Sequence, residues 1–356
     1  MRCIVAFVIY LVTCSSAYCQ QNDNIDRLFQ NYGGKLPGAS LAIIDHGQIS
    51  YMRAYGMANL EQAVYVSADT NFRLASITKQ FTATAILLLQ QQDKLQLDWT
   101  LDKIFTGFPA YGQKITIRHL LQHTSGLWDY EDFVEDIDPD TTTQIRDKAV
   151  LAITKQQTKT YFEPGAQFRY SNTGYALLAL IVEKYSQQPF AEFLEEHIFI
   201  PLGMNHTLAY IKNINRVSGR AFGYDMEQGQ WVRKDQSSTS AVLGDGGIYS
   251  SVRDLYLWDQ ALYSGKILPK GILAASFTPG QLNNGSQTRY GYGWHLKRSA
   301  DGQQVIFHTG SSTSFRNIFY RIPEQQISII ILTNRNQPEE MQMVDFAEKV
   351  LAAYQQ

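Results

Sequence analysis

The sequence predicts a mixed α+β fold, in which both ends of the chain form one antiparallel sheet that is flanked by helices, with an all-helical part inserted between them. Three observations predict this fold. Strand-like runs occur near both ends of the chain, and the long middle part carries helical spacing. A strongly apolar helix, which begins near Phe81, lies where the chain first passes from strands to helices.

Near the amino end, residues 40–55 are predicted to form a β-hairpin. Two strand-like runs, 40–44 and 48–55, are joined by Asp45-His46-Gly47, and the glycine suits a tight turn. A helix over residues 23–32 is expected to precede the hairpin.

Four strand-like runs lie near the other end, separated by turn residues such as Asp301-Gly302 and Pro323-Glu324. They are residues 290–296, 305–307, 315–321 and 327–333. We expect them to join the hairpin in one sheet, onto which a final helix over 341–354 packs.

Between these ends the chain is mostly helical. The run from Phe81 to Leu89 is apolar nearly all round, which is typical of a helix buried inside a domain. Further helices are predicted over residues 117–123, 144–154, 174–185, 189–198 and 251–263. Within one domain of residues 20–356, we place the sheet part at about 23–75 and 286–356, and the helical part at about 80–285.

The first residues have the pattern of a secretory signal peptide, which we assign to residues 1–19. Met1-Arg2 is a positive start, residues 4–12 are apolar, and Ser15-Ser16-Ala17 is a small-residue cleavage pattern. The apolar stretch is shorter than the roughly 20 residues that span a membrane. We therefore expect an exported protein without a transmembrane helix once the leader is removed. A weak resemblance of residues 11–14 to a lipoprotein box leaves anchoring at Cys14 as the alternative.

Composition narrows the class of protein. A hydrophobic fraction of 44% and a formal net charge of −2 describe a globular body with a sizeable core. Because there are no basic runs, nucleic acid and anionic membranes are not expected as partners. All three cysteines, Cys3, Cys14 and Cys19, lie in or beside the leader. We expect no cysteine chemistry in the mature body.

The stretch Phe72-Arg73-Leu74-Ala75-Ser76-Ile77-Thr78-Lys79 directly precedes the buried helix. Ser76 is expected at the mouth of that helix, near its unpaired amides and the positive end of its dipole. Lys79 lies one turn later on the same face, and a pKa lowered by burial would let it act as a base toward Ser76. Taken alone, Ser-x-x-Lys is expected about once by chance in such a chain, and Ser76 can simply cap the helix.

Tyr170-Ser171-Asn172 follows a loop rich in proline and glycine and leads into a helix. A tyrosine whose ionised form is stabilised by a nearby lysine can pass the serine proton to a leaving group, and the Asn172 amide can dock a substrate carbonyl. The alternative is that Tyr170 packs on the core and Asn172 caps the helix.

The third motif, His308-Thr309-Gly310-Ser311, is expected at the end of a strand. Gly310 would let a substrate lie against the strand edge, and the Ser311 N–H would form a second oxyanion donor beside the Ser76 N–H. On its own the motif is also consistent with an ordinary strand end.

In this order, the three motifs resemble the serine hydrolase family that unites class C β-lactamases with low-molecular-mass penicillin-binding proteins, D,D-carboxypeptidases and related esterases. The stretches 115–127, 201–204 and 244–251 also look like that family. The resemblance implies an α/β sandwich plus an all-helical domain, with the active site between them. It also implies a bacterial protein, in the periplasm or outside the cell.

The resemblance assigns roles residue by residue. It makes Ser76 the acylated nucleophile, Lys79 its proton acceptor and Tyr170 the second general acid and base. The residues that it implies for substrate binding are Asn172, His308, Thr309, Gly310 and Ser311. It implies no cofactor and no metal.

A histidine pair at helical spacing is a candidate metal site. His119 and His123 lie four residues apart, but Leu120 stands where a zinc protease has its glutamate. We therefore expect the pair to serve packing.

One departure from the family concerns the substrate. Class C β-lactamases usually carry lysine at the position of His308, whereas histidine there resembles the D,D-peptidase and esterase pattern. Because histidine is only partly charged near neutral pH, efficient β-lactam turnover is in doubt. Arg316 is a candidate for the missing charge, with an exposed strand arginine as the alternative.

The sequence thus predicts a secreted serine hydrolase that forms an acyl-enzyme on D-Ala-D-Ala-like peptides or β-lactams. The alternatives are an esterase or D-amino-acid peptidase or amidase, and a non-catalytic binding protein of the cell envelope. The partner is a small-molecule or peptide substrate, selected by loops such as 129–143 and 210–239.

Overall fold

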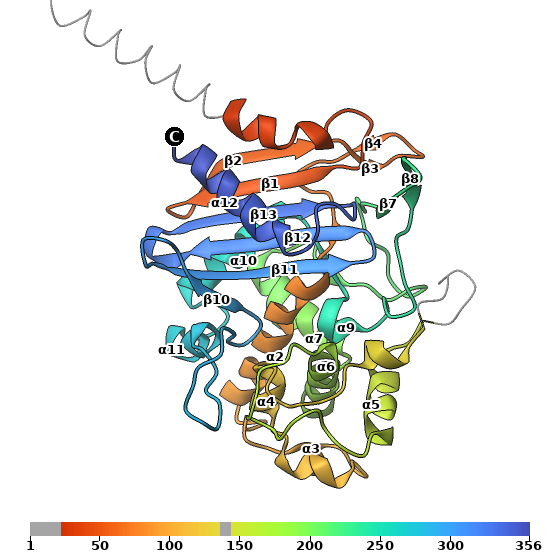
Figure 1. The fold of residues 1–356 in the computed structure, drawn as a ribbon, viewed down its shortest axis with the longest axis vertical. Helices are drawn as coiled ribbons and strands as arrows, with labels where there is room; N and C mark the ends of the chain where they lie inside the picture. Colours follow the sequence, from red (N-terminus) through yellow and green to blue (C-terminus); the bar gives the residue numbers. More distant parts are fainter. Residues whose placement is uncertain (1–22, 136–143) are drawn as a thin grey trace, which may run out of the picture.

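The chain folds around one six-stranded antiparallel sheet with the order β10-β11-β12-β13-β1-β2 (Figure 1). The structure is a computed structural model, and it describes residues 23–135 and 144–356. The strands of the sheet are β1 Ala39–Asp45, β2 Gln48–Tyr55, β10 His295–Arg298, β11 Gln304–Ser312, β12 Phe315–Ile322 and β13 Ile327–Thr333. Because β1 pairs with β13, the two ends of the chain share one sheet, which confirms the predicted fold class.

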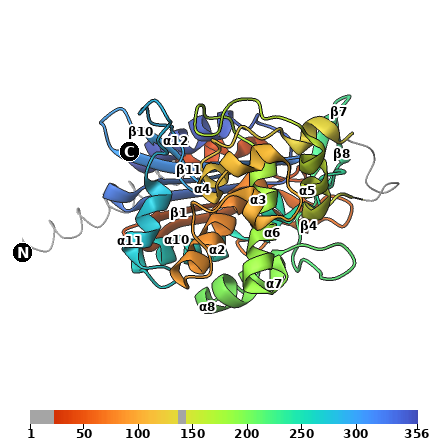
Figure 2. The same ribbon diagram turned by 90° about the horizontal axis from the view of Figure 1, so that it is seen from below.

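Both faces of this sheet are covered, and neighbouring residues of β1 therefore enter different cores. Leu41 and Ile43 pack with Val344 of α12, Gln342–Tyr354. Ile44 packs on the opposite face, in the same core as Trp258 of α10, Val252–Ser264. Figure 2 shows α12 and α10 on opposite sides of the sheet. Burial on both faces explains why β1 and β13 are almost continuously apolar.

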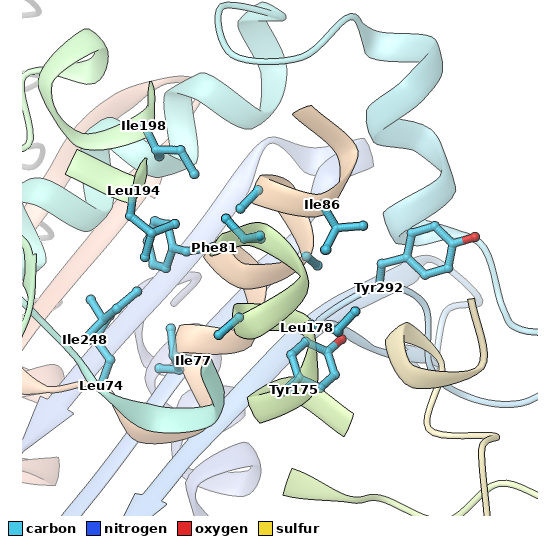
Figure 3. Packing of buried hydrophobic residues seen from close by; sticks show 14 of the residues in the cluster. Leu74, Ile77, Phe81, Ile86, Tyr175, Leu178, Leu194, Ile198, Ile248 and Tyr292 are labelled. Carbon is cyan, nitrogen blue, oxygen red and sulfur yellow. The ribbon is translucent and has the colours of Figure 1, made fainter. Parts of the chain in front are cut away.

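The helix predicted near Phe81 is α2, Lys79–Gln91, and every residue from Lys79 to Leu89 is buried. It follows directly on a 3₁₀ turn, η2, Ala75–Thr78. Figure 3 shows Phe81 and Ile77 in the same buried cluster as Leu178 of α6, Asn172–Ser186. Fully burying each such side chain contributes about 1.5–3 kcal/mol. This packing holds the start of α2 in a fixed place.

The remaining elements are short. The other helices are residues 23–28, α3 Leu101–Ile104, α4 Ile117–Leu121, α5 Asp147–Gln156, α7 Phe190–Leu194, η5 Glu195–Phe199, α8 Ile200–Leu202, α9 Leu243–Gly246 and α11 Lys270–Leu273. The 3₁₀ turns are η1 Gln30–Tyr32, η3 Ala110–Lys114, η4 Tyr130–Phe133, η6 Ala274–Phe277 and η7 Pro323–Gln325. The small strands are β3 Met57–Asn59, β4 Val64–Tyr65, β5 Phe72–Arg73, β6 Leu208–Ala209, β7 Tyr224–Glu227, β8 Gln230–Arg233 and β9 Ile248–Ser250.

The predicted hairpin, the buried helix and the final helix are confirmed, but three boundaries were wrong. The strand expected over 290–296 begins only at His295. The reason is that Gly293 has a φ of 77° and turns the chain against α2, where an added Cβ would lie 2.6 Å from the Lys79 carbonyl oxygen. The helix expected over 117–123 ends at Leu121, and His123 takes a left-handed φ of 56°. The strand expected over 305–307 continues to Ser312.

The predicted leader lies outside the described residues, and the export prediction stays a prediction. In the described ranges, none of the helices has the length and apolar character that crossing a membrane requires. The division into a sheet part and a helical part also stays a prediction. Within the stretch assigned to the helical part, α10 packs against the sheet.

Candidate active site

Ser76 lies in the 3₁₀ turn that leads into α2, at the positive end of the helix dipole. The turn is held from both sides. Leu74 N donates to Ile248 O at 2.8 Å, and β11 approaches so closely that a Cβ on Gly310 would lie 2.1 Å from Leu74 O. Gly310 is therefore required by this close approach of two backbones. Ser76 is partly exposed, whereas Lys79, one turn later, is completely buried.

The side-chain nitrogen of Lys79 brings three distant parts of the chain together. Its Nζ lies 3.0 Å from Ser76 Oγ, 2.8 Å from Asn172 Oδ1 and 2.9 Å from the backbone oxygen of Asp245. The two carbonyl oxygens can only accept hydrogen bonds, whereas a hydroxyl can accept or donate. If Lys79 is a neutral amine, its two N–H bonds go to the carbonyls and its lone pair faces the Ser76 hydroxyl. The arrangement thus suits a proton acceptor.

The charges around Lys79 act on its pKa in opposite directions. Burial lowers the pKa of Lys79, and the nearby Asp245, Glu131 and Asp129 raise it. Burial in turn raises the pKa of Asp245 and that of Glu131 to about 7. The Asp245 carboxylate accepts a hydrogen bond from Tyr130 Oη at 2.7 Å. Asp129 and Glu131 belong to the loop that was predicted to select the substrate, and Asp245 lies in α9, but none of the three was predicted as a residue of the site.

Tyr170 lies beside Lys79, as predicted, with its ring centroid 4.9 Å from Nζ. Burial raises the pKa of Tyr170 well above its ordinary value, and the neighbouring Ser76 hydroxyl only partly opposes this. Its hydroxyl is buried and has no hydrogen-bond partner among the described residues. Tyr170 is therefore a neutral phenol here and not the ionised form expected from the sequence.

Asn172 is the first residue of α6, and Ser171 occupies the capping position. The Asn172 backbone N–H donates to Asp129 Oδ2 at 2.7 Å, and its side-chain oxygen accepts from Lys79. The alternative that Asn172 serves as a helix cap is thereby excluded. Its side-chain amide hydrogen-bonds Glu131, which lowers the pKa of that carboxyl group.

His308 is buried and uncharged. Its Nδ1 donates to Thr309 O at 2.6 Å, so Nε2 accepts from the Tyr290 hydroxyl at 2.9 Å. Burial lowers the pKa of His308 well below its usual value, and Lys79 and His295 lower it further. The neighbouring Thr309 hydroxyl donates to Glu340 Oε1 at 2.7 Å. The Glu340 carboxylate thus lies at the wall formed by His308 and Thr309, to which the family resemblance assigns a carboxylate or another polar group of the substrate.

A polar cavity of about 250 Å³ opens beside Ser76. Ser76, Asn172 and Ser311 line it together, and Ser311 lies within β11 and not at its end. Arg73 and Glu131 also line this cavity, and sequence reasoning missed both. Arg73 is a charged residue between two apolar ones, Phe72 and Leu74, and this pattern could have indicated a functional arginine.

Arg316 is held at the turn between β11 and β12, and it does not line the cavity beside Ser76. Its Nη1 donates to the backbone oxygens of Phe315 at 2.9 Å and Thr313 at 3.4 Å, which ties it to the strand turn. The two histidines at helical spacing serve the backbone: His119 Nδ1 accepts from Thr116 N at 3.2 Å, and His123 Nδ1 accepts from Ser171 N at 3.1 Å. His123 thereby positions the loop that carries Tyr170.

Comparison with known proteins places this geometry among its relatives. The sequence profile of the Beta-lactamase family matches residues 25–354. The chain is 32% identical over 343 residues to penicillin-binding protein 4* of Bacillus subtilis (strain 168), across 92% of this chain and 75% of that protein. It is 33% identical over 256 residues to the putative penicillin-binding protein PbpX of the same organism, across 71% of this chain and 61% of that protein. The chain thus spans less than two thirds of the length of this second relative.

Two solved structures are also similar. The octameric penicillin-binding protein homologue from Pyrococcus abyssi superposes with a TM-score of 0.77 at 26% identity, covering 93% of this chain and 76% of that chain. The D-amino acid amidase from Ochrobactrum anthropi SV3 superposes with a TM-score of 0.77 at 25% identity, covering 94% of this chain and 99% of that chain.

Proposed function

The chain belongs to the Beta-lactamase family and is a serine hydrolase, and on this premise we propose that it works through an acyl-enzyme on Ser76. The observation that carries the proposal is the set of contacts made by Lys79. Its Nζ lies 3.0 Å from Ser76 Oγ and is held there by Asn172 Oδ1 and the Asp245 backbone oxygen. A buried amine that is fixed in this way is positioned to take the serine proton.

In the proposed reaction, Lys79 accepts the Ser76 proton as the serine oxygen attacks the substrate carbonyl. The N–H groups of Ser76 and Ser311 stabilise the negative charge that forms on the carbonyl oxygen. Tyr170 donates its phenol proton to the leaving group as the bond to that group breaks, and the Lys79 ammonium then returns a proton to Tyr170. Water, activated by the same two residues, hydrolyses the acyl ester and restores Ser76.

For the substrate, we propose D-Ala-D-Ala-like peptides or β-lactams as the first class. The support is similarity to proteins that are named as penicillin-binding. We also propose that the mature protein is exported, on the pattern of its first residues. This location would bring the enzyme to cell-wall peptides.

A second class, esters or D-amino-acid amides, is favoured by one specific observation. The wall formed by His308 and Thr309 has an uncharged imidazole and the nearby carboxylate of Glu340. Both D,D-peptides and β-lactams would bring a carboxylate to this wall, and like charges repel. A neutral ester or amide avoids that cost.

The proposal is tested by turnover of four substrates: a penicillin, a D-Ala-D-Ala peptide, D-phenylalanine amide and p-nitrophenyl butyrate. We expect Ser76→Ala to abolish turnover of every substrate that the unmodified protein cleaves, with an unchanged melting temperature. Ser286→Ala, at an exposed loop serine, is the matched control and should behave as the unmodified protein. Turnover that survives in Ser76→Ala would refute the assignment.

A further inference from the structure

We propose that Arg73 forms a subsite for a carboxylate on the acyl part of the substrate. This inference rests on the proposed acyl-enzyme function and narrows its substrate class to acyl donors with an anionic end. It starts from the cavity beside Ser76, which Arg73 lines together with Ser312 and Ser240.

Arg73 is a cation in a place where the fold would otherwise bury apolar groups. It belongs to β5, which pairs with β9, and its neighbours Phe72 and Leu74 are completely buried. The Arg73 side chain itself is only 4% exposed. Its Nε donates to Ser312 Oγ at 3.0 Å, and its Nη1 is buried with no hydrogen-bond partner in the described part of the chain.

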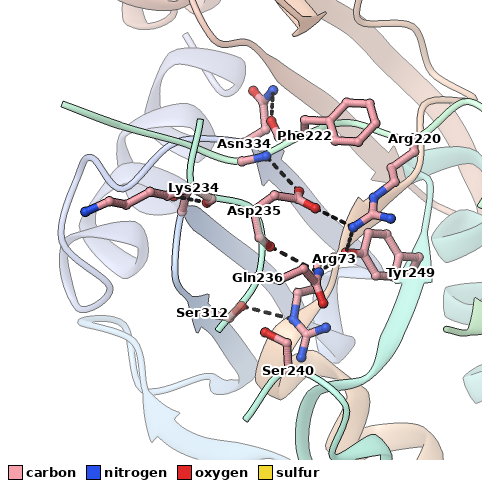
Figure 4. A network of polar contacts seen from close by, with 12 residues as sticks. Arg73, Arg220, Phe222, Lys234, Asp235, Gln236, Ser240, Tyr249, Ser312 and Asn334 are labelled. Atoms are coloured by element: carbon pink, nitrogen blue, oxygen red, sulfur yellow. Dashed lines mark hydrogen bonds and ion pairs between the residues drawn. The ribbon is translucent and has the colours of Figure 1, made fainter. Parts of the chain in front are cut away.

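Among the described residues, no acidic side chain forms an ion pair with this guanidinium. Arg220, which lies in the same polar network (Figure 4), is by contrast paired with Asp235. The Tyr249 hydroxyl beside both arginines is neutral, because burial raises the pKa of Tyr249 to about 12 despite their positive charges. Arg73 thus has no ion-pair partner in the part of the chain that the structure describes.

The two acids of the cavity are engaged elsewhere. Glu131 and Asp245 line the cavity with Arg73, but neither forms an ion pair with it, and the Asn172 side chain hydrogen-bonds Glu131 and lowers the pKa of that carboxyl group. Asp245 also accepts the Tyr130 hydroxyl. A buried charge without a partner is costly, and a bound anion would remove that cost.

The groups beside Arg73 suit a carboxylate. Because Ser312 Oγ accepts the hydrogen bond from Arg73, its own proton is free to be donated into the cavity. A carboxylate placed there would meet the Arg73 guanidinium and the Ser312 hydroxyl together. Hydrogen bonds between charged groups of this kind are roughly twice as strong as neutral ones.

The cavity holds the acyl part of the substrate rather than the leaving group. In the proposed reaction the leaving group takes its proton from Tyr170. Tyr170, His308 and Thr309 do not belong to the lining of this cavity, whereas Ser76 and Ser311 do. The group that stays attached to Ser76 therefore extends toward Arg73.

The test compares the p-nitrophenyl monoesters of succinic, glutaric and adipic acid with the same esters in which the free carboxylate is capped as a methyl ester. We expect kcat/KM to favour the anionic ester by at least tenfold for one of the three chain lengths. In Arg73→Gln that ratio should fall to about one. If Arg73 served folding alone, Arg73→Gln would lower kcat/KM for both esters alike and leave their ratio unchanged. That result would overturn the proposal.

Two further variants keep the test decisive. Ser312→Asp brings a carboxylate next to Arg73 and should also remove the preference for the anionic ester. This variant tests the subsite if Arg73→Gln does not fold. Arg298→Gln, at an exposed arginine, is the matched control and should keep the ratio of the unmodified protein. Loss of the preference in Arg316→Gln but not in Arg73→Gln would overturn the assignment to Arg73.

Failure of this inference differs from failure of the proposed function. If release of p-nitrophenol depends on Ser76 but shows no preference for the anionic ester at any chain length, the subsite alone is rejected. Release that continues in Ser76→Ala rejects the acyl-enzyme itself.

Discussion

Replacing Gly310 by alanine tests whether the contact between β11 and the turn before α2 sets the geometry of catalysis. The alanine Cβ would lie 2.1 Å from Leu74 O, whereas such contacts essentially never occur below 3.0 Å, so the two segments must separate by about 0.9 Å. The proposed oxyanion donors, the N–H groups of Ser76 and Ser311, lie within two residues of the clash. The shift therefore widens the distance between them.

The expected cost follows from that displacement. A misplacement of about 1 Å lowers rates by about 10²-fold, and loss of one oxyanion donor costs about 10²–10³-fold. We expect kcat/KM for p-nitrophenyl butyrate to fall about 10²-fold in Gly310→Ala, with a loss of about 1–3 kcal/mol in the free energy of unfolding. Gly271→Ala, where an added Cβ meets nothing within 4 Å, is the control and should leave the rate unchanged. A Gly310→Ala protein with kcat/KM within about threefold of the unmodified value would refute the reasoning.

Three further predictions concern other parts of the molecule. Asp259→Asn should lower the free energy of unfolding in urea by about 3–5 kcal/mol, because it leaves the Arg321 guanidinium buried and unpaired. The double variant Asp259→Leu with Arg321→Met should lose less, and an equal or larger loss in the double variant would contradict this reasoning. The value of kcat/KM should rise with pH, because the base is the deprotonated form of Lys79 and burial lowers the pKa of Lys79 from 10.5. If kcat/KM decreased as the pH is raised from about 6 to 9, Lys79 would be excluded as the base. Glu340→Gln should raise kcat/KM for a penicillin several-fold relative to a neutral ester, because it removes the negative charge beside Thr309; an unchanged ratio of the two kcat/KM values would exclude that repulsion.

The predictable part of the site is the part that depends on local spacing. Ser76 and Lys79 are three residues apart on one helical turn, so their contact follows from helix geometry alone. The hairpin and the strand β13 could likewise be predicted from the sequence. The run of isoleucines in β13 is typical of a strand that is buried on both faces. The order of the three motifs then indicated the family.

The remaining features depend on contacts between distant segments. The Asp245 carbonyl that holds Lys79 lies 166 positions away from it in the chain, and although residues 244–251 look like the family, no local spacing predicts this contact. The carboxylate of Glu340 reaches Thr309 only through the loop before α12. The sequence predicts a strand where Gly293 forms a turn. The turn is caused by the close approach of α2, which is a tertiary contact. The neutral state of Tyr170 follows from burial, which the sequence does not reveal.

The most direct test of the central claim is rapid-quench intact-mass spectrometry of the protein mixed with a penicillin or with p-nitrophenyl butyrate, followed by peptide mapping. The account predicts a mass increase equal to the acyl group, located on Ser76 and absent in Ser76→Ala. An adduct that persists with penicillin would indicate the penicillin-binding type, and one that appears only early would indicate a β-lactamase. Turnover of either compound with no adduct at any time, or an adduct on another residue, would contradict the acyl-enzyme on Ser76.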